Sequence, residues 1–157
     1  MRRAVLAAAL ALRCVTPATE VMLVIDTDLT AGDDVDAVRV VVRREGAAGA
    51  PSHDVVYDLR SGRFGFPGTI GVVARDPDDR VPLEVTVSAS RGGVERLSAR
   101  ATGTPTAAAI ARLDVFLARR CLDAGASACG RGTTCGRTGC EPVARDPLPP
   151  FTPPATP

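Results

Sequence analysis

Apolar and polar residues alternate along most of the chain between residues 19 and 120, and this period of two is typical of half-buried β-strands. The clearest stretch runs from Val81 to Ala89, where every second residue is apolar. Turns rich in glycine or proline separate the alternating stretches. The pattern predicts seven strands, at residues 21–25, 38–43, 55–59, 70–74, 81–89, 97–101 and 113–119.

Residues 104–120 also fit a helix, because a Thr-Pro pair opens the segment and Ile110, Leu113 and Leu117 have helical spacing. Apolar residues alternate in the same segment, and the six earlier strands need a partner. We therefore expect a strand over residues 113–119, after a helical turn at residues 107–110.

Seven short strands in about 100 residues predict a mainly β fold, an antiparallel β-sandwich of immunoglobulin-like or fibronectin-like size. The sandwich is expected over residues 19–120, followed by a cysteine-rich segment at residues 121–140. Seven of the last 17 residues are proline, so residues 141–157 are expected to form an extended or disordered tail. The pattern leaves the strand order open.

The N-terminus has the layout of an export signal: Met1-Arg2-Arg3 precedes nine apolar residues, which are too few to span a bilayer. Residues 1–18 are therefore predicted to be a signal peptide. Its removal takes away three arginines and no acid, and changes the formal net charge from +1 to −2.

Two ways of processing this signal remain open. Residues 11–14 (Ala-Leu-Arg-Cys) resemble the lipobox of bacterial lipoproteins, with Arg13 in place of its small residue, and this resemblance implies a lipid on Cys14. Cleavage after Ala18 would instead give a secreted product. Both routes place the protein in the cell envelope or outside the cell, with membrane contact only through a lipid anchor.

Four further cysteines lie within 20 residues, and in an exported chain they predict two disulfides. Three pairings are open, of which we favour the interlaced one. The gaps of seven, five and four residues do not match the closely paired cysteines of zinc sites. The four are Cys121, Cys129, Cys135 and Cys140.

Composition excludes several kinds of chemistry. All 19 basic residues are arginine, which rules out a lysine Schiff base and a lysine-bearing phosphate loop. Arginines and acids are interspersed and tryptophan is absent, so we expect no nucleic-acid partner. The expected partner is another envelope or extracellular protein.

Aspartates crowd the end of the first predicted strand and the loop after it. This cluster resembles the calcium-binding aspartates of nucleoside hydrolases and, more faintly, the metal site of von Willebrand A domains. Those resemblances imply a calcium ion, and hence a calcium-dependent binding module or a metal-assisted hydrolase as the alternative function. The candidate ligands are Asp26, Asp28, Asp33 and Asp34. No other cofactor is expected.

The tripeptide Ser52-His53-Asp54 contains the residue types of a catalytic triad. Consecutive side chains of an extended segment point to opposite faces, so the three cannot converge. We predict no catalytic residue.

The whole chain resembles uncharacterised exported, lipoprotein-like bacterial proteins with a β-sandwich and a C-terminal four-cysteine segment. The segments that carry this resemblance are residues 24–29, 69–75, 113–121 and 129–142. The resemblance implies a cell-envelope β-domain and supplies no catalytic residue. The sequence therefore favours a non-catalytic module with a structural or adhesive role.

Overall fold

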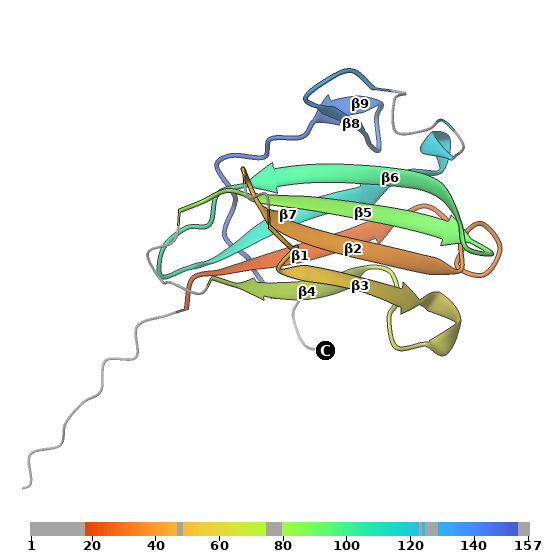
Figure 1. Ribbon diagram of the computed structural model, residues 1–157, viewed down its shortest axis with the longest axis horizontal. Coiled ribbons are helices and arrows are strands. Elements are labelled where there is room, and N and C mark those ends of the chain that lie inside the picture. Colours follow the sequence, from red (N-terminus) through yellow and green to blue (C-terminus); the bar gives the residue numbers. More distant parts are fainter. Residues whose placement is uncertain (1–17, 47–48, 75–79, 123, 125–128, 154–157) are drawn as a thin grey trace, which may run out of the picture.

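Figure 1 shows a computed structural model of the chain, which describes residues 18–46, 49–74, 80–122, 124 and 129–153. The fold is mainly β. All seven expected strands are present, and two three-residue strands follow in the cysteine-rich segment. The strands are β1 (Glu20–Thr27), β2 (Ala37–Arg44), β3 (His53–Asp58), β4 (Gly68–Val73), β5 (Leu83–Arg91), β6 (Val94–Gly103), β7 (Ile110–Leu117), β8 (Thr133–Cys135) and β9 (Cys140–Pro142).

Two single-turn 3₁₀-helices, η1 (Leu59–Ser61) and η2 (Arg119–Cys121), complete the regular elements. No helix in the described ranges is long and apolar enough to cross a membrane. Cys14 and the rest of the predicted signal peptide up to residue 17 lie outside the described residues.

The seven long strands form two sheets, with orders β3-β2-β5-β6 and β4-β1-β7, and the hairpin β8-β9 forms a third. Every pairing is antiparallel except β1 with β7, which is parallel. The expectation of a wholly antiparallel arrangement is therefore wrong for this pair. Alternation determines which face of a strand is buried but not the direction in which the strand runs. The loop after β6 crosses to the other sheet, where β7 then runs parallel to β1.

The strand order also differs from that of an immunoglobulin constant domain, in which the first strand pairs with the second. Here the first strand pairs with the fourth and the seventh. The strand order expected of an immunoglobulin constant domain is therefore not found among the described strands.

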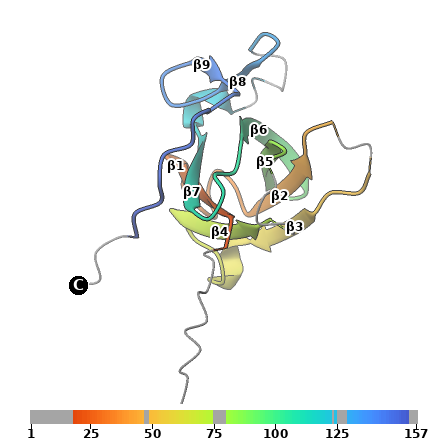
Figure 2. The ribbon, with the colours of Figure 1, turned by 90° about the vertical axis from the view of Figure 1, so that its left-hand side faces the viewer.

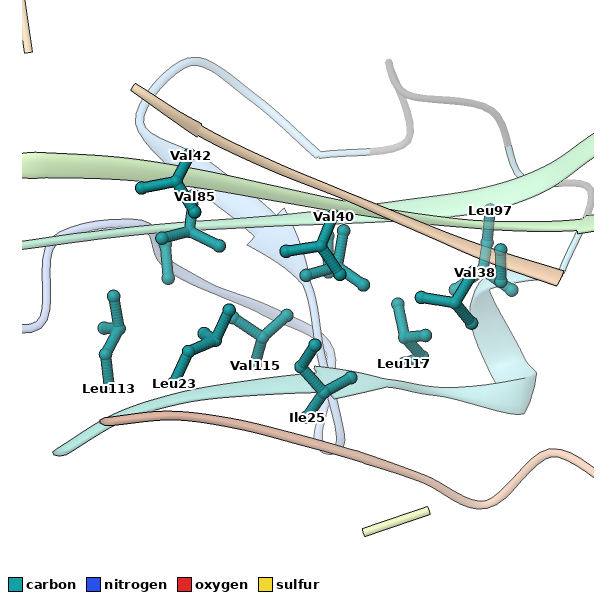
Figure 3. Close-up of a cluster of buried hydrophobic side chains, with 14 of the residues drawn as sticks. Leu23, Ile25, Val38, Val40, Val42, Val85, Leu97, Leu113, Val115 and Leu117 are labelled. Atoms are coloured by element: carbon teal, nitrogen blue, oxygen red, sulfur yellow. The ribbon is translucent and has the colours of Figure 1, made fainter. Parts of the chain in front are cut away.

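One hydrophobic core lies between the two larger sheets, and both contribute to it. Figure 3 shows side chains of β1 and β7 pointing toward those of β2, β5 and β6. Most apolar positions of the alternating pattern are buried, although Val55 and Val81 are exposed, so packing largely follows from the period of two. The inward side chains include Leu23, Ile25, Val38, Val40, Val42, Val85, Val87, Leu113 and Leu117.

Residues 104–120 contain strand β7 and η2, so the strand interpretation is confirmed and the longer helix is not found. The helical turn expected at residues 107–110 is instead a non-helical turn, in which Ala108 has a φ of 51°. Thr19 stabilises this turn because its hydroxyl accepts a hydrogen bond from the Ala108 amide at 3.0 Å.

Of the two states expected for the tail, extended or disordered, the described part at residues 141–153 is extended. This segment runs along the edges of β6 and β7, where Thr102 donates to the carbonyl of Val143 and Arg112 donates to that of Pro149. Leu148 is 8% exposed and fills the space that the missing side chain of Gly103 leaves. Prolines lack an amide proton but keep a carbonyl, so a proline-rich segment can accept hydrogen bonds from a sheet edge. Residues 154–157 lie outside the described residues.

Candidate functional site

The acidic loop after β1 is organised by one arginine, Arg119, at the far end of β7. Its guanidinium binds the Asp34 carboxylate through both nitrogens, and its backbone amide donates to Asp28 Oδ1 at 2.6 Å. Leu29 and Val35 are buried and hold the loop against the core. The loop is therefore tied to β7 by charge and to the core by apolar packing.

Asp34 is the most strongly engaged acid of this loop. The Thr30 amide donates to Asp34 Oδ2 at 2.7 Å, and this bond, together with the Arg119 guanidinium, holds the pKa of Asp34 below its ordinary value. A carboxylate that is already neutralised in this way has little charge left for a metal ion.

The four predicted calcium ligands do not come together. Asp26 lies on the outer face of β1, Asp28 and Asp34 bind Arg119, and Asp33 is exposed in the turn. Within the described ranges, no three histidine, cysteine or acidic side chains form a group that could hold a metal ion. The calcium site implied by the sequence resemblance is thus not assembled. The physical reason is that an arginine distant in sequence occupies the centre of the loop.

A groove of about 810 Å³ lies on the outer face of the three-stranded sheet. Its floor is formed by outward-facing residues of β1 and β7, among them Val24 and Phe116. The β8-β9 hairpin with the turn between its strands forms one wall, and the tail at Phe151 forms another. Ligand sites are concave and largely apolar with a few polar groups, so this groove is a candidate site.

The charges in the groove are paired with one another. Arg112 and Asp114 form a two-pronged ion pair with contacts of 2.7–3.0 Å, and this hydrogen bonding raises the pKa of Arg112. Arg137 lies 3.9 Å from the centre of the Phe116 ring and 3.5 Å from Asp26 Oδ2. The cation above the ring contributes a cation–π attraction, and it covers the aromatic floor.

Glu141 of β9 holds the wall in place. Burial works to raise its pKa, but the Thr138 amide and the Arg145 guanidinium outweigh burial and keep the pKa below its ordinary value. Its carboxylate accepts from Thr138 at 3.2 Å and from Arg145 at 3.1 Å. Glu141 therefore links the hairpin turn to the start of the tail.

The hairpin that forms this wall is attached by the two disulfides, which are confirmed and interlaced. Cys121 pairs with Cys135, and Cys129 pairs with Cys140. Cys121 is 3% exposed and belongs to the core, so its bond joins the hairpin to the interior of the domain. Thr134 adds a contact with β6, because its hydroxyl accepts from the Arg100 amide.

Of the predicted site residues, only Asp26 lines this groove. Sequence reasoning missed Arg112, Asp114, Phe116 and Arg137. The alternation in β7 could have predicted that Arg112, Asp114 and Phe116 lie together, because it places them on one face of the strand. Nothing local in the sequence indicates that Arg137 covers Phe116, since that contact depends on the disulfides.

A second pocket, of about 520 Å³, lies at the end of the molecule where β1 begins, between the start of β3 and the end of β4. Ser52 and His53 line it. The side chains of His53 and Asp54 point to different partners. His53 Nε2 lies 3.2 Å from the Tyr57 hydroxyl, whereas Asp54 binds Arg39 at 2.7 Å. Hydrogen bonding to Arg39 lowers the pKa of Asp54.

Comparisons of the chain with protein-family models, with curated proteins and with solved structures found no match.

Proposed function

We propose that this protein is a non-catalytic, exported module that is secreted or held in the cell envelope, and that its two larger sheets form a β-sandwich of immunoglobulin-like size. Its role is structural or adhesive, and its partner is another envelope or extracellular protein. The single observation that carries this proposal is the pair of interlaced disulfides. Two disulfides indicate an oxidising, non-cytoplasmic environment.

The attachment of the hairpin supports export in a second way. One wall of the outer groove depends on the bond between buried Cys121 and Cys135, so the groove is complete only where that bond persists. The sequence supplies the route, because the basic start and the apolar run of residues 1–12 have the layout of an export signal. Lipid attachment at Cys14 would keep the exported module at a membrane.

The pairing of charges in the groove supports a binding role. A catalytic acid or base needs an available side chain whose pKa suits its task. In the groove, Asp114 is bound by Arg112, Asp26 faces Arg137, and Glu141 is held by Thr138 and Arg145. Such paired charges fix the shape of a surface, which suits adhesion or assembly.

The test is the intact mass of the full chain, purified from the envelope of an exporting bacterium without reductant and treated with a thiol-alkylating reagent. We expect the chain to begin either at Cys14 with a diacylglyceryl group or at Thr19 after cleavage that follows Ala18, and the four C-terminal cysteines to remain unalkylated. A Cys14→Ser variant is the matched control and should lack the lipid mass. A chain that begins at Met1 with four alkylated cysteines would show that export and disulfide formation are both wrong.

The calcium-dependent alternative has its own test. A ligand present at 100 times its Kd stabilises the native state by about 2.7 kcal/mol. We expect no change in Tm on adding millimolar Ca²⁺, because Arg119 occupies the acidic loop. A rise in Tm that Asp34→Asn removes would restore the metal-binding interpretation.

A further inference from the structure

We propose that the β4 edge, meaning the edge of β4 that faces away from β1, is a docking site for an extended segment of a partner protein. This segment presents a basic side chain on its outer face and apolar side chains on its inner face. The inference rests on the binding role in the proposed function and deepens it, because it names the surface and the chemistry of the partner. It needs neither the signal peptide nor a lipid.

The two larger sheets end in four edge strands, and the tail covers only two of them. It forms backbone hydrogen bonds with β6 and β7, so it closes one side of the molecule. Figure 2 shows the tail running beside β7, whereas β3 and β4 are the strands at the opposite ends of their sheets. In the part of the chain that the structure describes, no strand pairs with the outer edge of β3 or of β4.

Charge distinguishes these two remaining edges. The exposed residues of β3 include Asp54 and Asp58, and charged side chains on an edge strand discourage pairing with another strand. Strand β4 has the sequence Gly-Thr-Ile-Gly-Val-Val, without a charge or a proline. An uncharged edge strand without proline is the kind that accepts a further strand. The β4 edge is therefore the one that suits a partner.

The backbone groups that β4 offers follow from its register with β1. The Ala74 amide donates to the Thr19 carbonyl at 3.0 Å, and in an antiparallel pair every second residue directs its amide and carbonyl to the partner strand. The backbone groups of Thr69, Gly71 and Val73 therefore point away from β1. All three residues are exposed, so an added strand can form the usual ladder with them.

Glu20 supplies a charge at the β4 edge. It is the cross-strand neighbour of Val73, and its carboxylate reaches diagonally over Gly71, where a β-carbon would collide with Glu20 Oε1. Within the described ranges, this carboxylate forms no hydrogen bond or ion pair. A partner residue opposite Gly71 would lie next to the carboxylate, and a basic side chain there would form an ion pair with it.

The same carboxylate decides against a second copy of this chain as the occupant. Two copies of β4 could pair about a two-fold axis at Gly71. Each Glu20 reaches over its own Gly71, so the two carboxylates would then approach each other, and like charges placed opposite are destabilising. The charge therefore favours a basic segment of another protein.

The inner side of this edge is incompletely filled. The four-stranded sheet has one strand more than the sheet that it faces. Val55 of β3 is the cross-strand partner of buried Val40 and so points inward, yet it is 39% exposed. The pocket of about 520 Å³ lies between the start of β3 and the end of β4, with Val72 and Leu83 in its lining. Apolar side chains on the inner face of an added strand would fill this space and lose contact with water.

The tail is an example of the same kind of pairing within the chain. It bonds to β6 and β7 through the backbone, and its Leu148 is buried in the space beside Gly103. In strand addition, main-chain hydrogen bonds give affinity and pockets for alternate side chains give specificity. The β4 edge offers both, because three backbone positions lie beside a pocket.

The test is a peptide with the expected pattern, acetyl-Thr-Val-Arg-Val-Thr-amide, added to the full chain at millimolar concentration. Its arginine is placed to lie opposite Gly71, and its valines are placed to face the pocket. Hydrogen exchange of single amides is followed by NMR. At saturation we expect exchange at Thr69, Gly71 and Val73 to slow by about tenfold or more, because these amides become hydrogen-bonded. Exchange at Val56, on the edge of β3, should not change.

The charge has a control of its own. Glu20→Gln keeps the shape of the side chain and should raise the Kd of the arginine peptide by about two- to fivefold, as for an exposed ion pair. A matched peptide with glutamine in place of arginine should bind both proteins equally well. Circular dichroism confirms that the variant is folded. An unchanged Kd for the arginine peptide, or an equal loss for both peptides, would overturn the basic character of the partner.

The remaining outcomes separate this proposal from its alternatives. No slowing at the three β4 amides, or equal slowing at Val56, would overturn the docking edge and leave the intact-mass test of export unaffected. A chain with four alkylated cysteines would overturn export, whereas the peptide result would stand. Slowing that rises with protein concentration without peptide, together with a doubled mass in sedimentation, would identify a second copy as the occupant and overturn the partner segment.

Discussion

The seven-stranded domain and the C-terminal region, residues 121–153, are held together by different forces. In the domain, alternating valines and leucines bury one face of most strands, and this core holds the two sheets against each other. The C-terminal region has no such alternation and depends on two disulfides, Glu141 and one buried leucine, Leu148. The seven-stranded domain is thus ordered by burial of apolar side chains, and the C-terminal region is ordered by a few separate attachments to that domain.

The difference teaches where each region is vulnerable. Damage to the core should unfold the whole domain, because its residues contact one another across both sheets. Damage to an attachment of the C-terminal region should release that segment and leave the sheets folded. The predictions that follow test this contrast, beginning with the largest expected effect.

Removal of a core side chain should give the largest loss. Leu113 is 0% exposed at the centre of the core, and a Leu113→Ala change should lower the free energy of unfolding by about 3–5 kcal/mol. Denaturant unfolding followed by circular dichroism measures this change. Val94→Ala in the exposed turn is the control and should lie within about 0.5 kcal/mol of the native value. Equal losses in both variants would contradict a core of this kind.

Removal of the buried disulfide comes next. The double change Cys121→Ala with Cys135→Ala opens a loop with a sequence separation of 14 and should cost about 3 kcal/mol. Hydrogen exchange at the Arg100 amide should also become faster, because Thr134 would no longer be held beside it.

The second disulfide provides the matched control for that change. Cys129→Ala with Cys140→Ala opens a loop of similar size but leaves the hairpin joined to the core. Exchange at Arg100 should then stay slow. Fast exchange in both double variants would mean that the hairpin is not held by the buried bond.

Detachment of the tail should cost less. Leu148→Ala empties the space beside Gly103 and should lower the free energy of unfolding by about 2 kcal/mol. The amides of Thr102 and Arg112, which donate to the tail, should exchange faster while those between β2 and β5 do not. Thr152→Ala, an exposed change in the same tail, should have no effect on either amide. A global rise in exchange would show that the sheets do not stay folded when the tail is released.

The smallest effect is expected at the ion pair of Asp34 and Arg119. The pKa of Asp34 is lowered in the folded state, so its contribution to stability is present above the ordinary value of 3.8 and is lost as the pH falls through the lower, folded value. Arg119→Ala should move the pKa of Asp34 toward 3.8 in an NMR titration. The Thr30 amide remains, so the return should be incomplete. An unchanged pKa would show that Arg119 does not neutralise this loop.

Most strands could be predicted from sequence because burial imposes a period of two on them, and β1 could be predicted from its continuous apolar run. The alternation around Val40 and Val87 is a local pattern, and it needs no knowledge of partners. The parallel pairing of β1 with β7 could not be predicted in this way, because it depends on how the loop after β6 crosses between sheets. The fit of Leu148 beside Gly103 joins residues 45 positions apart, and no local signal predicts it.

The candidate site was predicted less well for the same reason. The aspartates after β1 are close in sequence, and closeness in sequence suggested a shared ion. In the structure, Asp28 and Asp34 bind Arg119, which lies 85 residues beyond Asp34 in the sequence. Asp26 binds Arg137. A cluster of like charges in sequence is thus as compatible with several separate cation partners as with one metal.

The parallel pairing of β1 with β7 also brings the two ends of the described chain together. Glu20 is the cross-strand neighbour of Ile110, and the Phe151 amide donates to the carbonyl of the same Ile110. Two strand spacings, about 10 Å, therefore separate the first strand from the tail at Phe151. A short glycine-rich linker can join these ends, and new termini can be opened between Gly92 and Gly93 without breaking a strand. Circular permutation is thus open to this fold, and it would move both termini to the opposite end of the molecule.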